Sequence, residues 1–214
     1  MSPRAPVVLA VPDDDVATAL AFAIDEAARH ACGLRLVGYD EAMLREVAAR
    51  VAGVVVEVRV VRGPPVRAVL DASADARLVV VRRRDLLHLI RALTDPDEVI
   101  PTTFADPPIA CVPPAWVLPV DDRPVAVGIE DTDDAAVMLE RAHDLCGAEP
   151  LLPIHSSHPR AGDTLVEQSA GSRLLLLGRN QADPRGGTRL GRTARTVLHA
   201  SACPVVLLPP RGRG

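Results

Sequence analysis

The sequence contains no lysine, so all 24 of its basic residues are arginine. Arginine does not lose its proton in proteins and cannot replace a primary amine as a nucleophile. This absence excludes a pyridoxal Schiff base, a phosphate loop built on a lysine, and a lysine general base. Large classes of enzymes are therefore excluded before any motif is considered.

Aromatic residues make up only 2% of the 214 residues. They are Phe22, Tyr39, Phe104 and Trp116. So few rings cannot form the stacking surface that binds single-stranded nucleic acid, nor a ring-lined sugar cleft. The formal charge of −4 also provides no basic surface for a polyanion. We expect no nucleic-acid partner.

Cysteine pairs and long apolar runs are also missing. The four cysteines are Cys32, Cys111, Cys146 and Cys203. They form no C-x-x-C motif, so we expect reduced, buried thiols and no metal site. No apolar stretch approaches the length that spans a membrane, and the first apolar run, 7–11, precedes three aspartates (13–15), which does not fit a signal peptide. The sequence predicts a cytoplasmic protein with no membrane partner.

Short apolar runs of strand length alternate with amphipathic segments of helix length, which is typical of β-α-β units around a parallel sheet. The expected strands are 7–11, 34–38, 54–61, 77–81, 109–112, 124–129, 150–154, 174–177 and 205–208. The aspartates at 13–15 precede the first helical pattern, and we expect them to cap that helix. The predicted fold class is α/β.

The chain contains an internal repeat. The matched segments are 78–81 with 174–177, 107–114 with 203–210, and Cys32-Gly33 with Cys146-Gly147. The first two pairs are 96 residues apart and the third is 114 apart, so 18 residues are missing from the second copy between its second strand and the next helix. We expect it to lack its second helix and third strand. The predicted units are 1–113, with five strands, and 124–214, with about four, joined by a linker over 114–123.

The closing strands, 109–112 and 205–208, would be exposed edges unless they are paired. We expect them to pair within the chain, so that the two units pack as a pseudo-dimer. A homodimer through the face left open by the shortened copy is a further expectation. Strand 150–154 should become an edge strand, which Pro150 and Pro153 fit.

A phosphate-binding pattern follows the last-but-one strand of the second copy. It reads G-x-x-Q-x9-G-R and continues into a helix. Glycines let backbone N–H groups approach phosphate oxygens, and a helix start adds donors and the positive end of its dipole. In an open parallel sheet, ligands bind beyond the carboxyl ends of the strands at the switch point. The candidate site residues are Glu130, Gly178, Gln181, Gly191, Arg192 and Thr193.

This pattern resembles the G-x-x-G-x9-G-[ST] loop of universal stress proteins. The segment 125–130 (VAVGIE) resembles the opening strand of that family, and 197–208 (VLHASACPVVLL) resembles its closing helix and strand. The resemblance covers nearly the whole chain as two tandem copies. It implies flavodoxin-like (Rossmann-like) units, a stress-response or regulatory role without enzyme activity, and ATP binding in some members. Because Gln181 replaces a glycine and Arg192 a hydroxyl, we expect weak ATP binding in the second copy only.

The first copy keeps no such loop. Arg82 stands where the second copy has Gly178, and we expect the run 82–84 to be a solvated charged face. The apolar segment 86–93 is expected to be a structural helix. His155 and His158 should follow the second strand of the second copy, where nothing completes a metal site or a catalytic set.

Two alternatives to a nucleotide-binding stress protein stay open. One is a nucleotide-free scaffold or interaction protein, in which Gly178 merely ends a strand. The other is an enzyme of the adenine-nucleotide α-hydrolase type. That enzyme needs a Ser/Gly-rich pyrophosphate loop after the first strand, where this chain has the acidic segment 130–134, which would repel pyrophosphate.

Overall fold

The computed structural model describes residues 4–63, 65–85, 107–119, 122–130, 135–157, 159–178 and 191–209. The chain divides into two units, unit 1 (Met1–Pro114) and unit 2 (Ala115–Gly214). The predicted helical segment 86–93 lies outside the described residues. The packing of the two units against each other stays a prediction.

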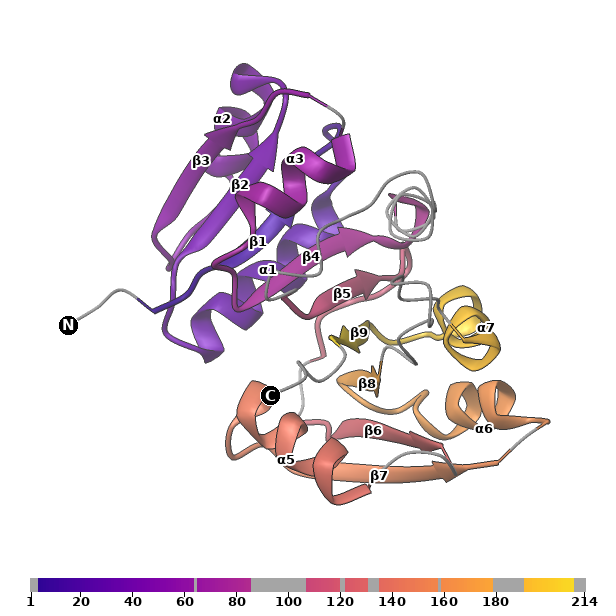
Figure 1. The fold of residues 1–214 in the computed structure, drawn as a ribbon. Helices are drawn as coiled ribbons and strands as arrows, with labels where there is room; N and C mark the ends of the chain where they lie inside the picture. The colour runs from indigo at the N-terminus through magenta and orange to yellow at the C-terminus, as the bar shows by residue number, and fades with distance from the viewer. Residues whose placement is uncertain are drawn as a thin grey trace. The chain divides into compact units, whose positions relative to one another are not determined.

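Among its described residues, unit 1 contains a five-stranded parallel sheet (Figure 1). Its strands are β1 (Val7–Ala10), β2 (Leu34–Gly38), β3 (Val56–Val60), β4 (Leu78–Arg82) and β5 (Ile109–Val112). Every residue of β2, β4 and β5 is buried, as in strands covered on both faces. The order β3-β2-β1-β4-β5 is Rossmann-like and places the switch point between β1 and β4.

Three described helices connect these strands. They are α1 (Ala17–Arg29), α2 (Glu41–Ala49) and α3 (Pro65–Ala72). Helix α3 lies in front of β1 and β2 in Figure 1, and its Val69 and Ala72 belong to a cluster with Val8 and Val37. Burial of this apolar stripe holds α3 on the sheet.

The starts of α1 and α2 differ. Helix α2 begins after Asp40, whose carboxylate accepts hydrogen bonds from two backbone N–H groups of its first turn, at 2.9 and 3.1 Å. Helix α1 begins after Val16, and no side chain caps it. The prediction that the aspartates at 13–15 cap α1 is therefore wrong. The carboxylates of Asp13 and Asp15 bind arginine side chains instead.

Unit 2 contains a shorter version of the same plan. Its described strands are β6 (Val125–Glu130), β7 (Leu151–Ser156), β8 (Leu174–Gly178) and β9 (Val205–Leu208), in the order β9-β8-β6-β7. Its described helices are α5 (Ala135–Cys146), α6 (Ala161–Gln168) and α7 (Arg192–Ala200). From β7 the chain passes directly to α6, without the helix and strand that unit 1 has between β2 and α3. The predicted fold class, five parallel strands followed by four, is confirmed.

Strand β7 is the edge of this shortened sheet. In the described part of unit 2 it pairs with β6 alone. Pro153 lies in β7, and its side chain is exposed. Proline cannot donate a backbone hydrogen bond to a neighbouring strand, so it fits an edge strand. The prediction of an edge strand is confirmed, with bounds shifted to Leu151–Ser156.

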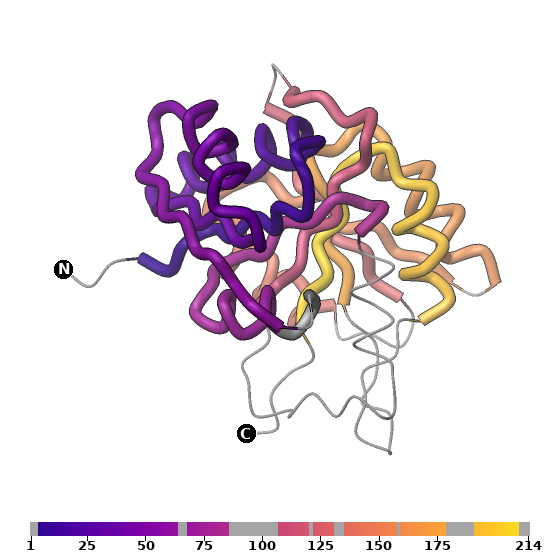
Figure 2. The backbone as a smooth tube through the Cα atoms, turned by 90° about the horizontal axis from the view of Figure 1, so that it is seen from above, coloured from indigo at the N-terminus to yellow at the C-terminus, as the bar shows by residue number. Residues whose placement is uncertain are grey.

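Close packing fixes the elements around β6 and α7. A side chain at Gly128 would collide with Leu177 of β8 and would come within 3.0 Å of Leu165 of α6. Figure 1 and Figure 2 both show α6 and α7 side by side. A Cβ at Gly162 would lie 2.7 Å from the Cβ of Thr196. Glycine fits both positions because neighbouring side chains pack directly against its Cα, so that a larger residue would require them to shift.

The four cysteines are free, as expected, and three of them are buried. Cys32 is only half-buried, because it follows the end of α1 rather than lying inside the sheet. Burial raises the pKa of the Cys111 thiol to about 12, so this thiol stays protonated and inert. In the part of the chain that the structure describes, no helix has the length and apolarity needed to cross a membrane.

Candidate functional site

The switch point of unit 2 lies between β6 and β8. Glu130 ends β6 and Gly178 ends β8, and these strands are parallel neighbours, so both residues lie at the carboxyl edge of the sheet. Helix α7 leads into β9, which is parallel to β8, so α7 must begin at this same edge. The fold therefore brings Glu130, Gly178, Gly191 and Arg192 to one edge. Gln181 lies outside the described residues.

The start of α7 offers hydrogen-bond donors. Gly191 is its N-cap, with φ −59° and ψ 164°, and makes no side-chain cap hydrogen bond. The first N–H groups of a helix have no carbonyl partner within the helix. Arg192 is exposed beside them, whereas Thr193 is buried with 4% of its surface exposed. The exposed groups at this helix start are therefore suited to an anion, but the buried Thr193 offers no solvent-facing hydroxyl.

The fold does not require glycine at position 178. Its φ is not in the left-handed region, which the described glycines 53, 63 and 147 occupy. A Cβ added there would lie 3.6 Å from the sulfur of Met138, an ordinary contact distance. The missing side chain is therefore not needed for packing against Met138, and the backbone conformation does not demand it.

At the equivalent point of unit 1, the strand ends in a buried arginine. Arg82 ends β4 and is only 8% exposed. Its Nε donates a hydrogen bond to Asp85 at 2.5 Å, and its Nη2 donates to Asp13 and Asp85, each at 3.0 Å. Its Nη1 donates to the carbonyl oxygen of Asp15 at 2.7 Å and also to the Asp13 carboxylate. The prediction of a solvated charged face is wrong for Arg82.

These contacts form the Arg82 cluster, which consists of Arg82, Arg84, Asp13, Asp15 and Asp85. The hydrogen bond from Arg82 holds the pKa of Asp13 below its usual value. Burial alone would lower the pKa of Arg82, but its hydrogen bonds to Asp13 and Asp85 outweigh burial and raise it. Arg84 adds contacts to Asp13 at 3.0 Å and to Asp15 at 2.9 Å. The cluster supplies the counter-charges of both arginines from within the chain.

Two further buried arginines, which form three ion pairs, were not predicted from the sequence. Arg35, on β2, donates to Glu57 at 2.8 Å and to Asp75 at 2.5 Å, which lowers the pKa of Asp75. Arg173, 2% exposed before β8, donates to both carboxylate oxygens of Glu149 at 2.8 and 3.0 Å. The only sign of these ion pairs in the sequence is an arginine within an apolar strand, or directly before one.

One of the two histidines singled out in the sequence lies near this edge of the sheet, because His155 pairs with Ile129, next to Glu130. His155 is exposed within β7 rather than following it, and His158 lies outside the described residues. Among the residues that the structure describes, no three His, Cys, Asp or Glu side chains are grouped as a metal would require.

No family model matches the sequence, and no curated protein matches it either. Solved structures do match. A putative universal stress protein from Pseudomonas aeruginosa superposes with a TM-score of 0.57 at 13% identity, covering 98% of this chain and 94% of that one. A universal stress protein from Archaeoglobus fulgidus gives 0.56 at 13% identity, covering 96% of this chain and 97% of that one. The chain has the fold of universal stress proteins.

A functionally unknown protein from Pseudomonas aeruginosa has the same fold, with a TM-score of 0.59, 13% identity, and coverage of 98% of this chain and 93% of that chain. The resemblance of the sequence to universal stress proteins is thus confirmed at the level of the fold along nearly the whole chain. At this identity, the likeness carries no residue's role across.

Proposed function

We propose that this protein is a universal stress protein-like regulatory protein of the cytoplasm, and that unit 2 binds the phosphate groups of an adenine nucleotide. The observation that carries the proposal is the start of α7, which no side chain caps, beside Gly178, which the fold itself does not need. A helix N-terminus at a switch point is suited to phosphate. The function is binding, not catalysis, because Glu130 ends β6 where an α-hydrolase needs a pyrophosphate loop.

The expected affinity for ATP is weak. Arg192 replaces the hydroxyl residue of the loop that this segment resembles. Losing that hydrogen bond to a charged phosphate costs about 1.5–3 kcal/mol of binding free energy, which raises the dissociation constant on the order of one to two decades. The exposed Arg192 recovers part of this loss, because a guanidinium can pair with phosphate through two hydrogen bonds. ATP should therefore bind through the backbone of α7 together with Arg192.

Titration calorimetry with ATP tests this proposal on the full chain. Gly191→Asp should abolish the heat of binding, because the carboxylate takes up the N–H groups of α7 and repels phosphate. The variant should still fold, since aspartate is a favourable N-cap. Arg192→Ala should weaken binding about tenfold. Arg84→Ala, which removes an exposed guanidinium from unit 1, is the matched control and should leave binding unchanged.

The nucleotide-free scaffold gives the opposite result. If wild-type protein shows no heat at about millimolar ATP, where even a weak site of this kind would be half-filled, the scaffold is correct. If Arg84→Ala weakens binding as much as Arg192→Ala, the ligand is not held at unit 2.

A further inference from the structure

A cavity lies within unit 2, at the opposite end of its sheet from the switch point. It has a volume of about 400 Å³. Arg123, Ser172 and Cys203 line it, and each comes two residues before a strand, β6, β8 and β9 respectively. Amino ends of parallel strands meet at one edge, so this cavity is distinct from the nucleotide site.

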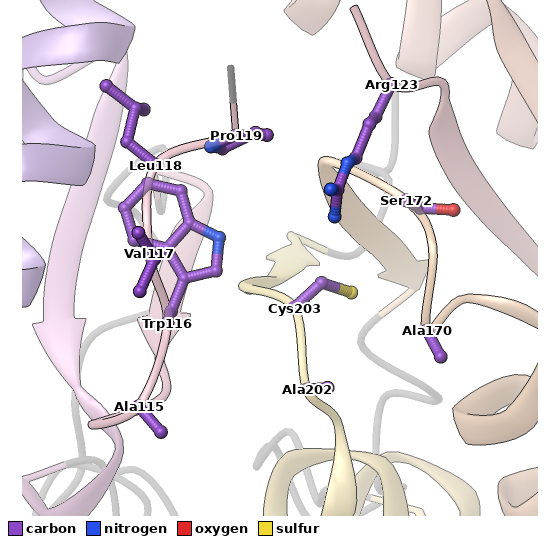
Figure 3. Close-up of a pocket in the computed structure, with 10 residues that line it drawn as sticks. All are labelled: Ala115, Trp116, Val117, Leu118, Pro119, Arg123, Ala170, Ser172, Ala202 and Cys203. Atoms are coloured by element: carbon purple, nitrogen blue, oxygen red, sulfur yellow. The ribbon is translucent and has the colours of Figure 1, made fainter. Parts of the chain in front are cut away.

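The walls of this cavity are largely apolar. They include Trp116, Val117 and Leu118, from a segment without regular secondary structure, together with Ala170 and Ala202 (Figure 3). Val117 is 80% exposed and Leu118 41% exposed, so two consecutive large apolar side chains lie open to water. A cavity of this size, with apolar walls and few polar groups, has the character of a small-ligand site.

One charged group identifies the ligand class. Figure 3 shows the guanidinium of Arg123 pointing into the space between Trp116 and Cys203. A guanidinium has five N–H donors, so it can bind a carboxylate through two of them and keep other contacts. An exposed cation that lines an apolar cavity complements an anion that carries an apolar body.

We propose that this cavity binds a small carboxylate with an alkyl body. The carboxylate pairs with Arg123, and the alkyl chain packs against the indole of Trp116 and covers Val117 and Leu118. The pairing fixes the orientation of the ligand, and burial of its chain supplies most of the affinity. This site is independent of the nucleotide proposal, because the two share no residue.

The single tryptophan of the chain lies in this cavity, so its fluorescence reports on the site directly. Hexanoate should change the emission of Trp116 with saturation. Hexanamide, which has the same chain without the charge, should bind at least about tenfold more weakly. Arg123→Gln should weaken hexanoate binding by a similar factor. Arg160→Gln removes an exposed arginine elsewhere in unit 2 and should leave binding unchanged.

Ala202→Leu provides a second variant in case Arg123→Gln does not fold. It fills the cavity from an exposed position, keeps the arginine, and should also abolish the response to hexanoate. Equal binding of hexanoate and hexanamide would overturn the proposal, as would emission that hexanoate does not alter. Emission that depends on protein concentration and not on hexanoate would show instead that a second copy of the chain covers Val117 and Leu118.

Discussion

In unit 1 the end of the strand at the switch point carries Arg82, held by Asp13 and Asp85, whereas in unit 2 the corresponding strand ends in Gly178. Both units place that strand beside the first strand of the unit, with the same parallel pairing. The backbone plan is therefore shared, and the two units differ in whether the residue that ends this strand carries a side chain. The comparison shows that the end of a switch-point strand can belong to a charged structural cluster, when the counter-charges come from the chain itself.

The largest effect on stability is expected in unit 2, at the Arg173–Glu149 pair. Arg173→Met should lower the free energy of unfolding by about 3–5 kcal/mol, because it leaves a carboxylate without its buried partner. Urea unfolding followed by Trp116 emission measures this, since that residue lies in unit 2. The control Arg160→Met, at an exposed arginine of the same unit, should change the value by less than about 0.5 kcal/mol.

The Arg82 cluster of unit 1 should contribute less. Arg82→Met is expected to cost about 1–3 kcal/mol, because the Asp13 side chain is 47% exposed and can regain water when its partner is lost. Arg84→Met, at a side chain that is 53% exposed, should cost about 0–1 kcal/mol. Urea unfolding followed by circular dichroism compares the two. Equal losses would show that the burial of Arg82 has no energetic consequence.

Adding a charged side chain at the end of β8 should reduce the difference between the units. Gly178→Glu should weaken ATP binding at least about tenfold by occupying the space beside α7 and repelling phosphate. Gly171→Glu is the matched control, because a side chain there meets nothing within 4 Å and adds the same charge to the same unit. Calorimetry that finds equal affinity in the two variants would place the ligand away from Gly178.

The smallest expected effect is on the response to acid. The pKa values of Asp13 and Asp75 are lowered by hydrogen bonds from Arg82 and Arg35, and both residues lie in unit 1. The stability that these pairs contribute is present above the ordinary carboxyl pKa of 3.8 and is lost as the pH falls through the lower, folded-state value. Acidification should therefore weaken unit 1 through these two groups.

Hydrogen exchange at about pH 6 and about pH 3 resolves this response by peptide. Protection factors of β1 and β4 should fall more than those of β6 and β8. In Arg82→Met the acid-induced loss of protection at β1 should be smaller than in the wild type, because this variant no longer has the stability that the Asp13–Arg82 pair contributes. A larger loss in unit 2 would contradict the assignment of acid sensitivity to these pairs.

The strands of both units could be predicted from the sequence to within two residues at each end. Their apolar runs are local signals, and the internal repeat showed which helix and strand the second copy lacks. Glu130, Gly178 and Gly191 could be assigned to one edge of a sheet because parallel strands align their ends. The cap of α1 could not be predicted, because Asp13 has a competing partner, Arg82, 69 residues away.

Periodicity along the chain determined the elements and their order, because burial of apolar faces depends on neighbouring residues. The internal repeat showed that Gly178 stands in the second copy where Arg82 stands in the first. Only the tertiary structure decided which carboxylate meets which guanidinium. The tertiary structure buried Arg82 at the end of β4, and it placed Trp116 and Arg123 around one cavity. Such contacts depend on strand register and on distances between residues far apart in the sequence, to which local patterns are insensitive.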